Sequence, residues 1–218
     1  MTKGKFISFE GCEGSGKSTQ IRLLAEYLDK INAPYIVTRE PGGSEIAEKI
    51  RGIVLDGKNK NMSDECEALL YAAAREQHLS EIIIPALNAG KLVICDRYVH
   101  SSLAYQGYAR GLGADYIRAI NSRVIREYMP DITLFLDISP EDAFNRKHGA
   151  DKNDRMEQLG LQFHNLVYRG YKEIQKNEPN FCAVDCHGEK ADTHANIVRL
   201  LQTKGIIVRH LQAKGMRY

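Results

Sequence analysis

The sequence lacks several features that would assign it to particular classes of protein. No apolar stretch approaches the roughly 20 residues of a membrane-spanning helix, and the first residues, MTKGKFISFEG, contain no apolar signal-peptide region. The net charge is only +2, so no large electrostatic field points to a nucleic-acid or membrane partner. The five cysteines are odd in number and scattered, which fits a reducing compartment. We therefore expect a soluble, cytoplasmic protein.

The composition is that of a globular domain. Hydrophobic residues make up 43% of the 218 residues and charged residues 27%, with only 18 glycines and 6 prolines. No linker-like change of composition divides the chain. We expect one domain over residues 1–205, with a polar lid segment at about 147–154 and a basic C-terminal extension over 206–218.

Short apolar runs alternate with longer amphipathic segments along the chain. Ser63 or Asp64 is well placed to cap the second of the predicted helices. Strands that alternate with helices are joined by right-handed crossovers, so the sequence predicts an α/β fold with a five-stranded parallel sheet flanked by helices. The predicted strands are 5–10, 35–38, 91–96, 133–137 and 181–185, and the predicted helices are 17–31, 64–89, 115–128, 140–147, 155–176 and 190–203.

The stretch EGCEGSGKST at residues 10–19 has the spacing of a phosphate-binding loop. It follows a predicted strand and opens a predicted helix, and its glycines let successive backbone N–H groups point at phosphate oxygens. Lys17 is expected to neutralise the β and γ phosphates and Ser18 to ligate Mg²⁺. An acid, Glu13, lies inside this anion-binding loop and needs an explanation. The residues expected around the triphosphate are Gly11, Cys12, Glu13, Gly14, Ser15, Gly16, Lys17, Ser18 and Thr19.

Charged residues follow two other predicted strands. Asp96 ends the third strand and can hold the Mg²⁺ shell, partly through water, while Arg97 after it can bind an anion. Arg39 stands at the end of the second strand, and ligands of a parallel sheet bind at this carboxyl edge. Two arginines facing a triphosphate suggest an acceptor that is itself a phosphate. A GTPase is disfavoured, because the nearest approach to its guanine-reading segment, residues 59–62, lacks the acid.

Five segments together resemble the thymidylate kinase family, whose members convert dTMP to dTDP using ATP. The segments are EGCEGSGKST, TREPGG, LLYAAAREQH, DRYVHSSLAYQG and DRME, in this order. The resemblance covers roughly residues 5 to 200 and is closest to the bacterial branch. It implies ATP and dTMP as substrates, Mg²⁺ as cofactor and a homodimer. The helices predicted over 64–89 and 115–128 are candidates for the dimer contact.

The resemblance also implies roles for residues around dTMP. Arg75 matches the arginine that hydrogen-bonds the thymine edge, and Tyr71, one turn earlier, matches an aromatic that stacks on the base. Arg97 matches the ligand of the dTMP phosphate, and Arg39 a second contact in this region. Tyr105 matches the aromatic beside the 2′ carbon of the sugar, where it disfavours ribose. The other implied dTMP-binding residues are Ser101, Ser102 and Gln106.

The family pattern also offers a reason for Glu13 and a source for the catalytic cation. The equivalent acid points toward the acceptor, where it accepts a hydrogen bond from the 3′-OH or helps to set Arg97 and Mg²⁺. One branch carries an arginine directly after this acid, whereas this chain has Gly14 there, and the bacterial branch supplies the cation from its lid. The expected catalytic residues are Lys17, Arg97, Glu13, Arg146, Lys152 and Arg155, with Arg146 and Arg155 as clamps and Lys152 as a weaker substitute.

Two other readings of the sequence stay open. A deoxynucleoside kinase transfers phosphate to a 5′-OH and needs a carboxylate base just past the second strand, a role that Glu40 could fill. A nucleotide-dependent binding protein with a decayed active site would bind ATP without turnover. The intact Lys17, Ser18, Asp96 and Arg97 argue against decay.

Overall fold

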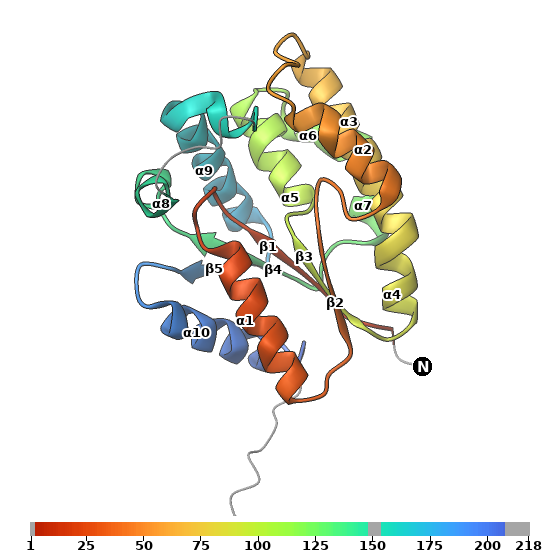
Figure 1. Ribbon diagram of the computed structural model, residues 1–218, viewed down its shortest axis with the longest axis vertical. Coiled ribbons are helices and arrows are strands. Elements are labelled where there is room, and N and C mark those ends of the chain that lie inside the picture. Colours follow the sequence, from red (N-terminus) through yellow and green to blue (C-terminus); the bar gives the residue numbers. More distant parts are fainter. Residues whose placement is uncertain (1–2, 148–153, 208–218) are drawn as a thin grey trace, which may run out of the picture.

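A computed structural model describes residues 3–147 and 154–207 (Figure 1). Its five strands are all parallel and lie in the order β2-β3-β1-β4-β5. This arrangement confirms the predicted five-stranded parallel sheet. The strands are β1 (Phe6–Glu10), β2 (Tyr35–Arg39), β3 (Leu92–Asp96), β4 (Ile132–Asp137) and β5 (Phe181–Asp185).

Helices connect the strands and cover both faces of the sheet (Figure 1). No helix within the described ranges is long and apolar enough to cross a membrane. The α-helices are α1 (Lys17–Lys30), α2 (Glu45–Leu55), α3 (Asp64–His78), α4 (Ile84–Asn88), α5 (Val99–Ser102), α6 (Ala114–Ile120), α7 (Ser122–Glu127), α8 (Pro140–Lys147), α9 (Gly160–Asn177) and α10 (Lys190–Thr203). Two π-helical segments, η1 (Leu79–Ile83) and η2 (Leu103–Ala109), and one 3₁₀ turn, η3 (Glu157–Leu159), complete the elements.

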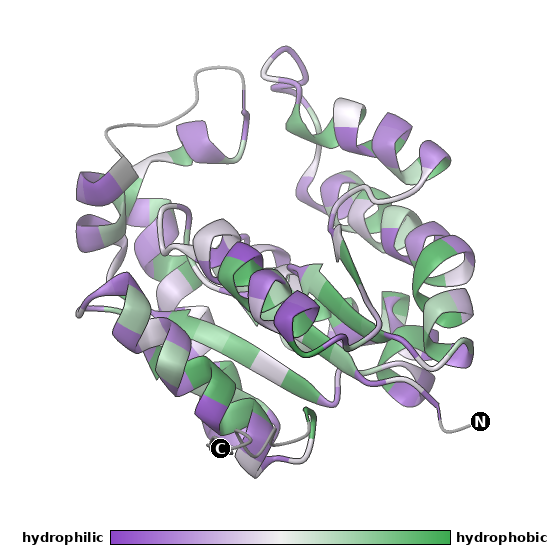
Figure 2. Ribbon diagram, turned by 60° about the horizontal axis from the view of Figure 1, so that its bottom comes forward, coloured by the Kyte–Doolittle hydropathy of each residue, from purple (hydrophilic) through white to green (hydrophobic). Residues whose placement is uncertain are grey.

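The alternation of side chains along each strand separates the core into two layers. In β1, Ile7 and Phe9 pack with α1 and α10 on one face. Phe6 points to the opposite face, where it packs with η1, α4 and the start of α5. Next to it on that face, β4 and β5 pack against η2 and α9. Figure 2 shows the result: the strands are largely hydrophobic, whereas the helices are hydrophobic on one side only.

Most of the predicted helices are present, with informative differences at their ends. The Ser63 hydroxyl accepts a hydrogen bond from the Cys66 amide at 3.2 Å, so the predicted cap of α3 is correct. The predicted helix over 64–89 is continuous but contains a π-helical segment directly before α4. Pro85 explains it, because proline has no N–H for the regular helical bond. The predicted helix over 115–128 is divided at Asn121 into α6 and α7.

The sequence reading missed two helical segments and set the end of the domain too early. Neither α2 nor the segment formed by α5 and η2 was predicted, although the apolar residues of α2, Ile46, Ala47, Ile50, Ile53 and Val54, follow the spacing of a helix. At the C-terminal end, Ile207 is buried in the core, so the packed domain extends past residue 205. The lid residues 148–153 and the extension beyond 207 lie outside the described residues.

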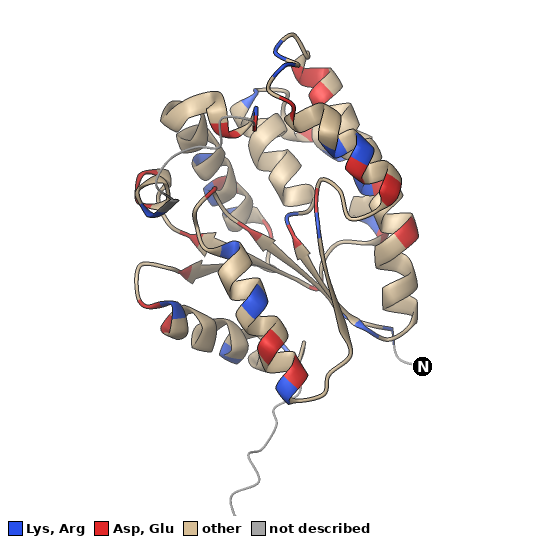
Figure 3. Ribbon diagram, in the orientation of Figure 1, with Lys and Arg blue, Asp and Glu red and all other residues tan. Residues whose placement is uncertain are grey.

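Every strand ends in a charged residue. Inside the strands no residue is charged, as Figure 3 shows. Because the strands are parallel, their charged ends meet at the carboxyl edge of the sheet. The five terminal residues are Glu10, Arg39, Asp96, Asp137 and Asp185. This edge is therefore the candidate site.

A buried polar chain lies beneath α5, on the face of the sheet that α9 also covers. The hydroxyl groups of Ser8 and Thr133 are 2.8 Å apart, and Thr133 Oγ1 lies 3.2 Å from His100 Nδ1. His100 Nε2 lies 2.6 Å from Glu178 Oε2, and Arg118 donates to the other Glu178 oxygen at 3.0 Å. The chain links two strands to α5 and the end of α9 without leaving these polar groups unpaired.

We expect Glu178 to stabilise the fold only while its carboxyl is ionised. Burial by itself raises its pKa, but hydrogen bonds and charge from His100 and Arg118 outweigh burial and hold the pKa below its ordinary value of 4.5. Because the folded-state pKa is depressed, the stabilisation is complete above the unfolded pKa and is lost as the pH falls through the folded pKa. Glu178→Gln should lower the unfolding free energy by about 1.5 to 3 kcal/mol at neutral pH.

Urea denaturation across the acid range measures both the deficit and its pH dependence. The deficit of Glu178→Gln should shrink as the pH falls below 4.5. Glu173→Gln is a matched control, because Glu173 pairs with Lys176 at the surface, and it should cost less than about 1 kcal/mol. A Glu178→Gln deficit that is the same at every pH would show that packing, not charge, is responsible.

Candidate active site

The phosphate-binding loop joins β1 to α1 and depends on glycine at its turns. Gly14 and Gly16 have φ angles of 77° and 95°, which L side chains rarely adopt. At Gly11 an added Cβ would lie 2.9 Å from Ser15 Oγ and 3.1 Å from the Leu136 carbonyl oxygen. Glycine at these positions lets the backbone curl tightly enough for its amides to surround an anion.

Lys17, the first residue of α1, is held across this loop. Its ammonium donates to the carbonyl oxygens of Gly11 at 3.1 Å and Cys12 at 3.2 Å. Burial lowers the pKa of Lys17 below its usual value. The carbonyl partners are neutral, so a phosphate oxygen, which carries charge, can compete for the ammonium.

A cavity of about 550 Å³ opens over this loop at the carboxyl edge of the sheet. We call it the donor cavity. Its lining combines the loop with basic side chains from several elements and with the connection between β5 and α10. The lining residues are Glu13, Gly14, Ser15, Gly16, Lys17, Ser18, Thr19, Gln20, Arg39, Glu40, Arg51, Asp96, Arg97, Arg146, Cys186, Gly188, Lys190 and Thr193.

Asp96, at the end of β3, lines the donor cavity and carries an unused acceptor. Its Oδ1 is buried and has no hydrogen-bond partner within residues 3–147 and 154–207. The Ser18 hydroxyl lines the same cavity and is exposed. A carboxylate and a hydroxyl are the oxygen ligands that Mg²⁺ takes beside phosphates and water. The residues present therefore fit this ion.

A second, smaller cavity of about 90 Å³ adjoins the first, and we call it the acceptor cavity. It is lined by aromatic side chains and by residues of α2, α3, α5 and η2. Four charged residues, Glu13, Glu40, Arg51 and Arg97, line both cavities. The other lining residues are Pro41, Leu55, Tyr71, Arg75, Tyr98, Ser101, Ser102, Tyr105, Gln106, Asp154, Met156, Glu157 and His164.

Glu13 and Arg97 form an ion pair where the two cavities meet. Arg97 Nη2 donates to Glu13 Oε1 at 2.5 Å, and Arg97 Nη1 donates to Ser101 Oγ at 3.2 Å and Tyr171 Oη at 3.3 Å. The Arg97 guanidinium also lies 5.2 Å from the centre of the Tyr105 ring. The acid inside the phosphate loop thus contacts an arginine on the acceptor side.

Glu10, which sequence reasoning did not single out, fixes the chain beside Arg97. Its Oε1 accepts from the amides of Tyr98 at 2.8 Å and Ser101 at 3.2 Å. Its Oε2 accepts from Ser101 Oγ at 2.6 Å and Tyr171 Oη at 2.8 Å. The carboxylate therefore fastens the start of α5 to the end of β1. Its position as the last residue of a buried strand was the available signal.

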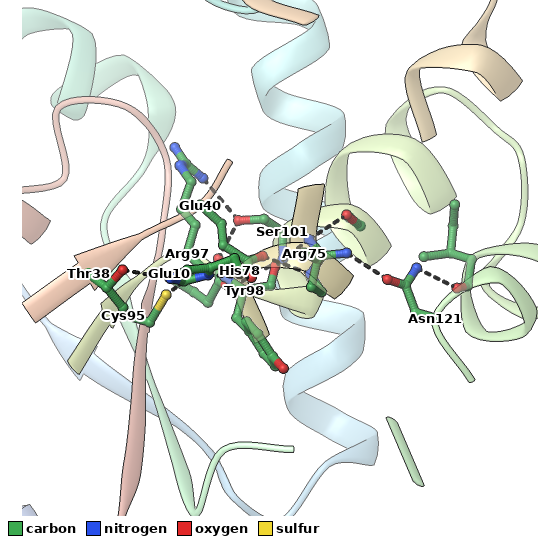
Figure 4. A network of polar contacts seen from close by, with 12 residues as sticks. Glu10, Thr38, Glu40, Arg75, His78, Cys95, Arg97, Tyr98, Ser101 and Asn121 are labelled. Atoms are coloured by element: carbon green, nitrogen blue, oxygen red, sulfur yellow. Dashed lines mark hydrogen bonds and ion pairs between the residues drawn. The ribbon is translucent and has the colours of Figure 1, made fainter. Parts of the chain in front are cut away.

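Arg75 on α3 lines the acceptor cavity and is hydrogen-bonded to a network of buried side chains (Figure 4). Its Nε donates to Glu40 Oε2 at 2.7 Å and its Nη1 to Asn121 Oδ1 at 2.7 Å. Its Nη2 donates to Ser102 Oγ at 2.9 Å. His78 Nδ1 lies 3.2 Å from the other Glu40 oxygen. The guanidinium that was expected at a base edge is thus fixed before any ligand binds.

Of the other residues expected at dTMP, Tyr71, Tyr105 and Gln106 line the acceptor cavity, whereas Arg39 lines only the donor cavity. Tyr71 and Tyr105 line the acceptor cavity, and burial raises the pKa of both phenols. Gln106 also lines it and donates to Glu67 Oε1 at 2.8 Å. Arg39 lines the donor cavity, with its guanidinium 3.1 Å from Glu48 Oε2.

The three expected lid cations have different outcomes. Arg146 lines the donor cavity and donates to the Cys186 carbonyl at 2.9 Å. Arg155 is turned away: it donates to Glu67 Oε2 at 2.6 Å and to the Val54 carbonyl at 3.0 Å, and it lines neither cavity. The buried Glu67 carboxylate explains this placement, because it needs cationic partners. Lys152 lies outside the described residues.

Sequence reasoning also missed Arg51 and His164. Arg51, on α2, donates to the Pro41 carbonyl at 2.8 Å and lines both cavities. It was missed together with its helix. His164, on α9, is fully buried and lines the acceptor cavity, and burial lowers the pKa of its imidazole. It follows an ordinary amphipathic pattern, so the sequence offered no signal for it.

The chain is similar to thymidylate kinases over almost its whole length. The thymidylate kinase family model matches residues 9–197. A thymidylate kinase of Finegoldia magna is 48% identical over 202 residues, which cover 93% of this chain and 100% of that protein. One of Clostridium novyi is 50% identical over 182 residues, 83% of this chain and 89% of that protein. A thymidylate kinase of Bacillus pumilus is 47% identical over 203 residues, which cover 91% of this chain and 95% of that protein.

The placement of Arg155 predicts a structural rather than a catalytic effect of its removal. Arg155→Ala should lower the unfolding free energy by about 1 to 3 kcal/mol, because the buried Glu67 carboxylate loses one charged donor. Arg146→Ala should change it by less than about 1 kcal/mol, since this residue is exposed and bonds one carbonyl. Urea denaturation of both variants measures the difference. If Arg155→Ala instead had wild-type stability and a much lower turnover number, Arg155 would have to act on the phosphates in catalysis.

Proposed function

We propose that this chain, which belongs to the thymidylate kinase family, transfers the γ-phosphoryl group of ATP to dTMP where its two cavities meet. Phosphorylation of dTMP to dTDP by ATP, a step of nucleotide biosynthesis, is the activity of the family, and the chain is a nucleoside-monophosphate kinase. The observation that carries the proposed site is the sharing of Glu13, Glu40, Arg51 and Arg97 between both cavities.

On the donor side, the loop from Gly11 to Thr19 binds the triphosphate of ATP. Lys17 exchanges its carbonyl partners for the β and γ phosphate oxygens, and Arg146 meets charge that develops on the transferring group. Ser18 would hold Mg²⁺, and Asp96 would hold it partly through water. When bound, the ion neutralises phosphate charge.

On the acceptor side, Arg97 binds the phosphate of dTMP and sets its oxygen in line with the γ phosphate. Glu13 orients Arg97 and accepts from the 3′-OH of the sugar. Arg75 donates to the thymine edge while Tyr71 stacks on the ring, and Tyr105 occupies the space beside the 2′ carbon. Little covalent chemistry is required of the protein, because phosphoryl transfer depends mainly on positioning and charge.

Ser101, Ser102 and Gln106 complete the proposed acceptor site, and Arg39 supports it from the adjoining donor cavity. Arg39 supplies a second positive charge near the phosphates from the end of β2. Ser101 is held between Arg97 and Glu10, and Ser102 accepts from Arg75, so each serine supports an arginine that contacts dTMP. Gln106 lines the same cavity from η2.

The deoxynucleoside kinase alternative requires Glu40 as the general base. Both oxygens of Glu40 already have partners: one lies 2.7 Å from Arg75 Nε and the other 3.2 Å from His78 Nδ1. A base must instead reach the hydroxyl that it deprotonates. These contacts favour dTMP over thymidine as the acceptor.

We further propose that the enzyme is a cytoplasmic homodimer that acts without a nucleic-acid or membrane partner. The outer faces of α2 and α3 support a dimer contact, because Ile46, Ile53 and Leu69 are about half exposed there, at 48%, 47% and 50%. Light scattering at micromolar concentration tests it, and a monomer would contradict the proposal.

Arg75→Ala should lower kcat/KM for dTMP. The decrease should correspond to a loss of about 2 to 4 kcal/mol of transition-state stabilisation, because a charged hydrogen bond to the substrate is removed. The KM for ATP should stay near the wild-type value, because Arg75 does not line the donor cavity. A coupled ADP-release assay measures both constants. Arg22→Ala, an exposed arginine on α1 that pairs with Glu26, is the matched control and should leave both unchanged. Equal losses for dTMP and ATP would contradict a role of Arg75 at the base.

Arg146→Ala should reduce kcat at least about tenfold, which corresponds to 1.4 kcal/mol, because a cation that faces the phosphates is removed. The affinity for dTMP should be largely retained, since Arg146 does not line the acceptor cavity. Steady-state kinetics with both substrates varied separates the two effects. A wild-type kcat would mean that Arg146 is an ordinary surface residue.

A further inference from the structure

Gln20 lines the donor cavity and carries a side-chain acceptor that is not used. The residue lies on α1, three positions after Lys17, and its side chain is only 3% exposed. Its Oε1 is buried and has no hydrogen-bond partner in the two described stretches, 3–147 and 154–207. A buried acceptor that stays unpaired is costly, so a donor is expected to reach it when the cavity is filled.

The orientation of the Gln20 amide follows from its one partner. Gln20 Nε2 donates to the Lys190 carbonyl oxygen at 3.0 Å. The reverse orientation would put two acceptors against each other, because a backbone carbonyl accepts and does not donate. The chain therefore commits the nitrogen to Lys190 and leaves the oxygen unpaired in a residue that lines the donor cavity.

The position of Gln20 within the donor cavity identifies what it meets. The acceptor cavity joins the donor cavity at Glu13 and Arg97, so the γ phosphate lies on that side of the loop. The nucleoside of the donor must then extend the other way. Gly188, in the β5–α10 connection, and Lys190, the first residue of α10, line the donor cavity together with Gln20, and Gln20 is bonded to Lys190.

We propose that Gln20 selects the base of the phosphoryl donor by accepting a hydrogen bond from the 6-amino group of adenine. Adenine presents an amino donor at this position, whereas guanine presents a carbonyl oxygen. Against Gln20 Oε1 the guanine oxygen would place two acceptors together without a proton, so GTP is disfavoured. The inference deepens the proposed function, because it rests on the donor cavity holding a nucleoside triphosphate.

Binding to the wild-type protein tests the inference without any variant. Calorimetry should find that ATP binds about tenfold more tightly than purine riboside triphosphate, which carries hydrogen in place of the 6-amino group. Equal affinities would overturn the proposal. This measurement needs no dTMP, so it stands apart from the proposed activity. If the protein binds ATP more tightly than purine riboside triphosphate but does not phosphorylate dTMP, only the assignment of dTMP as the acceptor is contradicted.

Gln20→Met then assigns the discrimination to this residue, since methionine fills similar space without an acceptor oxygen. Its affinity for ATP should fall about tenfold, while that for purine riboside triphosphate should not change, so the two become equal. The difference in affinity between ATP and GTP should become smaller in this variant as well. Gln175→Met is the matched control, because Gln175 on α9 also carries a buried unpaired Oε1 but lines neither cavity. If Gln20→Met keeps the wild-type ratio of the affinities for ATP and purine riboside triphosphate, the proposal is overturned.

Discussion

The acceptor half of this site depends on one constraint: a guanidinium removed from water has to be paired with a carboxylate. Two glutamates meet this need at the acceptor cavity and a third meets it outside both cavities, and each comes from a different element than its arginine. The pairs are Glu13 with Arg97, Glu40 with Arg75 and Glu67 with Arg155. Each pair therefore joins parts of the chain as well as holding a cation. The acid inside the phosphate loop has this explanation, because Glu13 fixes Arg97 at the junction of the cavities.

The cations of the donor half are held differently. Lys17 and Arg146 bond backbone carbonyls, which are neutral and can be exchanged for phosphate oxygens when ATP binds. Arg75 and Arg97 bond carboxylates and keep those partners. The difference suits the proposed roles of the two halves: the donor cations would follow a phosphoryl group that moves, whereas the acceptor cations would hold dTMP still while its phosphate oxygen attacks the γ phosphate of ATP.

The parts of the fold that the sequence predicts are those with a local physical signature. Strands of a doubly covered parallel sheet are continuous apolar runs, and the phosphate loop needs glycine at fixed spacing. The helix α2 does have a helical apolar pattern, but the structure leaves part of it, Ile46 and Ile53, about half exposed and buries Ala47 and Val54; the helix was not predicted, and Arg51 was missed with it. Arg155 shows the other limit. Its partner Glu67 is 88 residues away, and only the folded chain brings the two together.

The central claim is that the paired arginines form a site for a pyrimidine nucleoside monophosphate beside ATP. The most direct test is one coupled ADP-release assay of the wild-type enzyme with dTMP, dUMP, dCMP, dGMP, AMP and thymidine as acceptors. The account predicts the highest kcat/KM with dTMP, a lower value with dUMP and little turnover of AMP or dGMP. Thymidine, which has no phosphate for Arg97, should not be phosphorylated. Faster turnover of thymidine, AMP or dGMP than of dTMP would contradict the account.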